Sequence, residues 1–217
     1  MATLSELVDT IATTEGLDPA SVALIGRYLR EFGLITKRGR GLSAASMSVA
    51  DAANLLIAVN ATRNAAEAAK TAQTYRRLRP EEHEIPISEL RRDFTLGEAV
   101  EQLLTAAGSG ALPQPFLGIN RDDAIDLSEM FAAGQVHVEL RFRINAPSAL
   151  LRVAQAFDQA PTELALTIPA LVLLHFSWRR GRDPPGTRQH QNGDRVEEIT
   201  IGFRTLRAVG KLIRSQA

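Results

Sequence analysis

The chain of 217 residues contains no cysteine. This absence excludes disulfide bonds, metal sites built on thiolates and cysteine nucleophiles. A cysteine-free chain fits a reducing compartment, so we expect an intracellular, cytoplasmic protein. Long apolar runs are also missing, because no stretch approaches the roughly 20 consecutive apolar residues that a membrane span needs. The N-terminal MATLSELVDTIATTEG has neither a basic start nor an unbroken apolar run, and we therefore expect no secretion signal and no membrane partner.

Net charge is absent as well, since 25 basic residues balance 25 acidic ones. The two signs are nevertheless separated along the chain. Residues 27 to 79 hold ten basic and three acidic residues, a surplus of seven positive charges. Such a local excess favours contact with phosphates more than the neutral total suggests. The basic residues are Arg27, Arg30, Lys37, Arg38, Arg40, Arg63, Lys70, Arg76, Arg77 and Arg79, against Glu31, Asp51 and Glu67.

Helical signals dominate the first 80 residues. Apolar residues at helical spacing predict a helix from Leu4 to Thr13, and Asp18 followed by Pro19 predicts the start of a second one that stops at Gly33. Ser48 is expected to cap one long helix from residue 49 to 78, which Pro80 ends. The apolar sides are expected to hold Val22, Ile25, Leu29 and Phe32 in the second helix and Ala52, Leu55, Leu56, Val59, Ala66 and Ala69 in the third.

In the first half, FGLI predicts only a short strand that leads into the basic hairpin tip KRGRG, and the other strand signals appear in the second half. QVHVELRFRI, residues 135 to 144, alternates apolar and polar residues, which predicts a half-buried strand. LALTIPALVLLHFSW and VEEITIGF also predict strands, ALLRVAQAF fits either strand or helix, and RTLRAVGKLIRSQ predicts a closing helix. In the strand from residue 135 to 144 we expect a buried set at Val136, Val138, Leu140, Phe142 and Ile144, with Arg141 and Arg143 facing solvent or a partner.

These elements predict an α+β protein with an N-terminal helical domain followed by a C-terminal module with an antiparallel sheet. The expected domains are residues 1–80, helical and with the surplus of positive charge; 81–133, an acidic connector with helices near 96–107 and from about residue 121; and 134–217, an α+β assembly or sensing module.

Residues 6 to 41 carry a resemblance to a known family. The apolar face of the first helix, Gly16 and Leu17 in the turn, and FGLI after the second helix resemble the helix-turn-helix and start of the wing in winged-helix DNA-binding proteins. The resemblance implies that residues 1–80 form a winged-helix-like, DNA-binding domain. In that family the second helix lies in the major groove while the wing follows the phosphates. It makes Ser21, Arg27, Arg30, Lys37, Arg38 and Arg40 the candidate DNA contacts, with Gly39 and Gly41 allowing a tight turn.

The second helix departs from the family's pattern. Its groove-facing positions hold Pro19, Ala20, Ser21, Ala23 and Leu24, of which only Ser21 can hydrogen-bond a base edge. Strong sequence specificity from this helix is therefore not expected. Either the wing and the spacing of two half-sites supply it, or the surface binds protein.

Catalytic and metal-binding signals are weak. The histidines, at positions 83, 137, 175 and 190, lack the short spacing of metal ligands, and AAGSGALPQP lacks the lysine and helix onset of a phosphate-binding loop. The polar loop RRGRDPPGTRQHQNGDR offers no nucleophile with its base, although its arginines, between residues 179 and 195, form an alternative anion-binding surface.

We therefore expect a non-enzymatic DNA-binding protein without metal or cofactor, a bacterial or phage transcriptional regulator that binds double-stranded DNA as a homo-oligomer, at least a dimer. The alternative is an interaction or assembly protein, such as a DNA-packaging or phage adaptor, whose helix-turn-helix contacts protein or nonspecific duplex.

Overall fold

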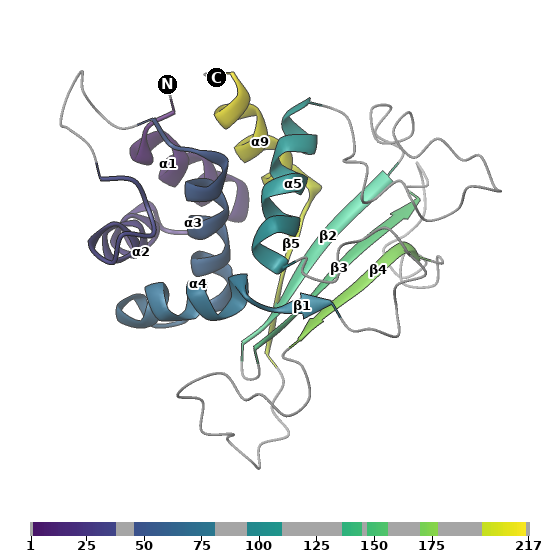
Figure 1. Ribbon diagram of the computed structural model, residues 1–217. Coiled ribbons are helices and arrows are strands. Elements are labelled where there is room, and N and C mark those ends of the chain that lie inside the picture. Colours follow the sequence, from purple (N-terminus) through teal and green to yellow (C-terminus); the bar gives the residue numbers. More distant parts are fainter. Residues whose placement is uncertain are drawn as a thin grey trace, which may run out of the picture.

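The computed structural model describes residues 2–37, 46–80, 95–109, 136–144, 147–155, 170–177 and 197–215. Within these ranges helices form one layer and an antiparallel sheet the other, so the chain is α+β (Figure 1). The helices are α1 (Leu4–Glu15), α2 (Pro19–Glu31), α3 (Val49–Ala61), the 3-10 helix η2 (Ala65–Glu67), α4 (Ala68–Arg76), α5 (Leu96–Ser109) and α9 (Phe203–Arg214). The strands are β1 (Arg79–Pro80), β2 (Val136–Arg143), β3 (Ser148–Gln155), β4 (Ala170–Ser177) and β5 (Glu198–Gly202).

The first two helices begin where the sequence predicts, whereas α1 continues two residues past the predicted end at Thr13 and α2 ends two residues before Gly33. Thr3 and Glu6 form a capping box at the start of α1, and Gly16 ends it with φ of 70°. The Asp18 carboxylate accepts hydrogen bonds from the backbone N–H groups of Ala20 and Ser21, which starts α2. Gly33, with φ of 77°, follows the end of α2. Both glycines adopt the left-handed conformation that a side chain would disfavour.

Helix α3 is the centre of the helical layer. Every residue from 51 to 61 is buried, because α2, α4, α5 and α9 pack around it. The predicted single helix from 49 to 78 is wrong, since the chain leaves the helix after Ala61. The Thr62 hydroxyl accepts from the backbone N–H of Asn64, and the Asn64 side chain accepts from Ala66. These local bonds compete with helix continuation, and Ala66, predicted to be apolar-facing, is exposed.

The sheet has the strand order β1-β4-β3-β2-β5, and every neighbouring pair is antiparallel. The segment 148–155, left open by the sequence, is the strand β3, and the short strand β1 was not predicted. The alternation predicted for β2 is confirmed where side chains are described: Val138, Leu140 and Phe142 are fully buried, whereas Ile144 is half-buried. On the other face Arg141 and Arg143 both contact Glu198.

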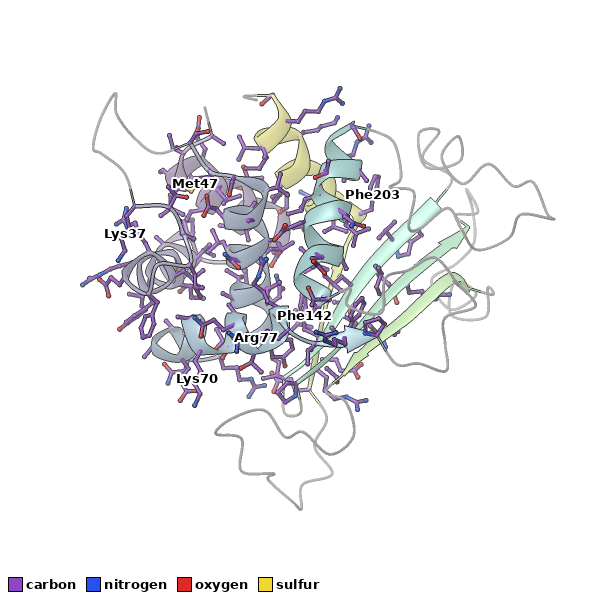
Figure 2. The ribbon with its side chains drawn as sticks, in the orientation of Figure 1. Lys37, Met47, Lys70, Arg77, Phe142 and Phe203 are labelled. Atoms are coloured by element: carbon purple, nitrogen blue, oxygen red, sulfur yellow. The ribbon has the colours of Figure 1, made fainter. Side chains whose placement is uncertain are left out.

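One hydrophobic cluster joins the helices to the sheet. Its buried side chains come from α1 to α5, from β2 to β5 and from α9. Phe142 lies where the sheet meets the helices (Figure 2), with its ring centroid 6.0 Å from that of Tyr75 on α4. The Tyr75 hydroxyl donates to the backbone carbonyl of Arg143. The expected domain boundaries at residues 80 and 133 stay predictions, and the core drawn from described residues spans both of them.

The last helix closes the structure beside the first. Helix α9 packs against α5 along its length and against α1, so residues near the two ends of the chain are neighbours (Figure 1). Gly108 and Gly210 let α5 and α9 approach closely: a Cβ atom on Gly210 would lie 2.2 Å from the Leu104 carbonyl oxygen. Among the described residues, no helix is both long and apolar enough to cross a membrane.

Candidate nucleic-acid interface

Helices α1 and α2 pack together around a short turn, Gly16 to Asp18. Helix α2 buries Val22, Gly26 and Leu29 and leaves the other side exposed. That exposed side holds all the candidate DNA contacts of the helix, namely Ser21, Arg27 and Arg30. The pairing of helices expected from the sequence is therefore present, with the second helix accessible along one side.

Two of these side chains already have partners within α2 or its cap. The Ser21 hydroxyl donates to Asp18 Oδ2 at 2.8 Å, and this bond and the backbone bonds from Ser21 and Ala20 lower the pKa of the Asp18 carboxyl. Arg27 Nε donates to Glu31 Oε1 at 2.8 Å, which raises the pKa of the guanidinium. The Arg27–Glu31 ion pair is exposed, so a phosphate can replace Glu31 as the partner of Arg27 at little cost.

Arg30 is exposed, and no acidic side chain in the described residues pairs with it. With Arg27 it lines a groove of about 500 Å³ between α1 and α2. The same groove contains the carboxylate of Asp9, so its charge is mixed. Its other lining residues are Leu4, Ser5, Val8, Pro19, Ala20 and Ala23.

Lys37 lies beside the end of α2, at the outer edge of the helical layer (Figure 2). Its Nζ donates to the Glu31 carbonyl at 2.9 Å, which places the cation at the C-terminal end of the helix. Residues 33 to 37 form a turn and a bend and belong to no strand of the described sheet. The expected short strand is therefore not present at these positions. The wing cations Arg38 and Arg40 lie outside the described residues.

A single buried carboxylate holds both ends of the segment that contains these cations. Asp51 Oδ1 accepts from the backbone N–H of Thr36 at 3.0 Å, and Asp51 Oδ2 accepts from the backbone N–H and the hydroxyl of Ser48 at 2.9 and 2.8 Å. Met47 is fixed nearby, because its N–H donates to the Ala2 carbonyl at 2.7 Å. The base of the basic segment is thus tied to the first turn of α3 by charge-assisted hydrogen bonds.

Part of the positive surplus is neutralised in the fold. Arg76 is half-buried and contacts Glu101 as well as Asn54 Oδ1, the latter at 2.9 Å, and Arg63 pairs with Glu197. Arg76 and Arg63 therefore hold elements together. The charge count along the sequence could not separate these structural cations from exposed ones such as Lys70 and Arg77.

Helix α2 also exposes apolar side chains. Leu17, Leu24 and Phe32 are the large hydrophobic residues exposed among those described, with 40%, 42% and 65% of their surface accessible. Phe32 was predicted to face the core, and this is wrong: at about 100° per residue the C-cap residue lies roughly 90° around the helix from the buried Val22, Gly26 and Leu29. Helix α2 and the residues that flank it therefore expose both cations and apolar side chains.

Helix α9 carries a row of cations that was not predicted from the sequence. Arg204, Arg207, Lys211 and Arg214 are all exposed, and the helix contains no acidic residue. The signal was present in RTLRAVGKLIR, because spacings of three, four and three residues place side chains on one face of a helix.

Histidine and carboxylate side chains do not gather into a metal site in the described ranges, where no group of three or more such ligands occurs. His137 has only Glu139 nearby, at 3.7 Å. His83 and His190 lie outside the described residues, as does the arginine-rich loop 179–195.

Glu15, the last residue of α1, is a half-buried acid. Burial raises the pKa of Glu15 from its ordinary value of 4.5 to about 7, although the Asn60 side chain donates to its Oε1 at 3.2 Å. The folded state therefore holds a proton that the unfolded chain has lost between these pH values, and stability is expected to fall by at most about 3 kcal/mol as the pH rises from 4.5 to 7.

Glu15→Gln is expected to remove this fall and to make the protein more stable than the parent at pH 8, because no carboxylate then loses its water on folding. Urea midpoints at pH 5 and pH 8 measure the effect. Asp9→Asn, at an exposed acid of the same helix, is the matched control. Equal pH dependence in Glu15→Gln and the parent would show that Glu15 is not responsible.

Comparisons of the chain with models of known protein families, with curated protein sequences and with solved structures found no match. The function is therefore argued from the residues of the site and their surroundings.

Proposed function

We propose that the protein is a non-enzymatic binder of double-stranded DNA that uses the helix-turn-helix of α1 and α2. The observation that carries this proposal is the common exposure of Arg27, Arg30 and Lys37 on one helix and the turn after it. Phosphate contacts supply most of the affinity of such surfaces through release of counterions. A role in transcription regulation, a homo-oligomeric state and a cytoplasmic location remain part of the same proposal.

The contacts are expected to be mainly with the DNA backbone. Base recognition needs bidentate donors such as Arg, Asn or Gln at groove-facing positions, but α2 offers Ala20, Ala23 and Leu24 there, and the Ser21 hydroxyl is occupied by Asp18. We therefore expect modest discrimination between sequences and a strong dependence on salt.

The test removes three cations together. Arg27→Gln, Arg30→Gln and Lys37→Gln in one chain are expected to make the slope of log affinity against log salt shallower by about 2.7, or 0.9 for each lost phosphate contact. Fluorescence anisotropy of a labelled 30-base-pair duplex gives the slope. The charge-conserving variant with Arg27→Lys, Arg30→Lys and Lys37→Arg is the control and should keep it. An unchanged slope in the first variant would move DNA binding away from this surface.

A second candidate function follows from the apolar side of α2. Exposed Leu17, Leu24 and Phe32 are suited to a protein partner, which favours the interaction or assembly protein expected as the alternative. The salt series distinguishes the two functions, since an adaptor that contacts only protein does not bind duplex at low salt.

A further inference from the structure

The exposed face of α9 carries four cations in one narrow row. At 3.6 residues per turn, Arg204, Arg207, Lys211 and Arg214 fall within an arc of about 80°, and a rise of 1.5 Å per residue spreads them over about 15 Å. Neighbouring cations are thus separated by about 4.5 to 6 Å along the helix. Double-stranded DNA presents one phosphate on each strand per about 3.4 Å of its axis, so several phosphates lie within reach of such a row.

No acidic side chain among the described residues pairs with the row, and Arg214 alone has a recorded side-chain bond, donating to the Gly108 carbonyl at 3.0 Å. None of the acids on α1, α5 and β5, which pack against α9, pairs with the row. On α1, Glu6 bonds to Thr3, Asp9 lines the groove shared with α2, and Glu15 accepts from Asn60. On α5 and β5, Glu98 bonds to Thr95, Glu101 to Arg76, and Glu198 to Arg141 and Arg143.

Helix stability does not explain the row. Lys211 and Arg214 lie in the last turn, where a cation interacts favourably with the helix dipole. Arg204, however, lies in the first turn, where the dipole disfavours positive charge. This turn has no acidic residue, and the N-cap residue Gly202 provides no side-chain bond. A row that continues into the unfavourable end suggests that a ligand outside the chain meets its charge.

The packing of α9 decides which polyanion fits. The face opposite the row is buried, through Thr205, Leu206, Val209, Gly210 and Ile213. A basic helix that binds a lipid surface needs a free apolar face to insert into the lipid. The apolar face of α9 is not free, because it packs against α1 and α5. The close contact between Gly210 and α5 also fixes the row in place.

We propose that the cationic row of α9 binds the phosphates of a nucleic-acid backbone. Choice of duplex DNA as the ligand rests on the proposed function, whereas the row itself fits the backbone of either a duplex or a single strand. The row is a different set of residues from the candidate contacts on α2, since none of its residues lines the α1–α2 groove.

The experiment compares two variants that lose the same charge in the full chain. One carries Arg204→Gln, Arg207→Gln and Lys211→Gln and retains Arg214, which bonds to α5. The other is the α2 variant with Arg27, Arg30 and Lys37 replaced by Gln. Affinities for a 30-base-pair duplex and for one of its strands are measured by anisotropy over a salt series, and thermal unfolding verifies that both variants fold.

In the α9 variant the slope of log affinity against log salt is expected to move toward zero by about 2.7. A control variant that keeps the charges, with Arg204→Lys, Arg207→Lys and Lys211→Arg, should have the slope of the parent. A parent-like slope in the α9 variant overturns the assignment of the row, even where the α2 variant loses binding and supports the proposed function. If the parent binds only the single strand and the α9 variant loses that binding, the assignment of the row is supported and the proposed binding of duplex DNA is overturned. Equal losses in the α9 variant and its charge-conserving counterpart, or no binding of the parent to either probe, also overturn the row.

Discussion

Leu140→Asp is expected to unfold the protein. Leu140 is fully buried in β2, where its register partners are Leu151 in β3 and Ile201 in β5. Both neighbours are themselves buried in the cluster that joins sheet and helices. An aspartate there is either an unpaired buried charge or a neutral acid formed at the cost of binding a proton, and the backbone groups beside it already bond to the adjacent strands. The expected loss is about 5 kcal/mol or more, which consumes the stability of an ordinary domain.

Thr200→Asp is the matched control for this change. Thr200 is exposed on β5 and is the register partner of Arg141, so the same carboxylate meets solvent and a cation. Its effect is expected to stay within about 0.5 kcal/mol. Urea unfolding followed by circular dichroism compares the two. A cooperative transition of Leu140→Asp near that of the parent would contradict the packing of the sheet against the helices.

Gly210→Ala is expected to destabilise the protein by about 3 kcal/mol through overpacking. The added Cβ would lie 2.2 Å from the Leu104 carbonyl oxygen and 2.8 Å from the Gly108 backbone nitrogen. Both are backbone atoms of α5, so one of the helices must move. The direction of the change in stability is informative, because Gly→Ala in an exposed helix interior stabilises a protein by about 1 kcal/mol.

Gly26→Ala provides the control within the same chain. Gly26 is also buried in a helix, but its added Cβ would meet Leu4 Cδ1 at 3.4 Å, the flexible end of a side chain. We therefore expect this variant to be as stable as the parent or slightly more so. Denaturant midpoints of the two variants test the close contact of α5 and α9, and equal stability would rule it out.

Local signals in the sequence predicted local structure well. Asp18 with Pro19, Ser48 with Asp51, and the glycines at 16 and 33 define helix ends through bonds within a few residues, and the alternation in β2 identified its buried face. The break after Ala61 was missed because the apolar pattern continues across it, and only the bonds of Thr62 and Asn64 show where the chain turns.

Contacts between residues far apart in the sequence could not be predicted from the sequence. The pairs Arg76 with Glu101 and Arg63 with Glu197, and the bond from Thr36 to Asp51, join residues far apart in sequence. Among the predicted site residues that the structure describes, Ser21, Arg27, Arg30 and Lys37 are exposed, and their role as DNA contacts stays a prediction. The row of cations on α9 was not predicted, although the helical spacing of these residues is visible in the sequence.

Binding of the protein to the phosphates of double-stranded DNA is measured by the affinity of the unmodified full chain for a duplex of random sequence over a salt series. We expect binding at about 50 mM salt that weakens with a log–log slope of about −3 or steeper, since at least three phosphate contacts are expected. An absence of binding at that salt concentration, or an affinity that does not change with salt, would contradict this expectation.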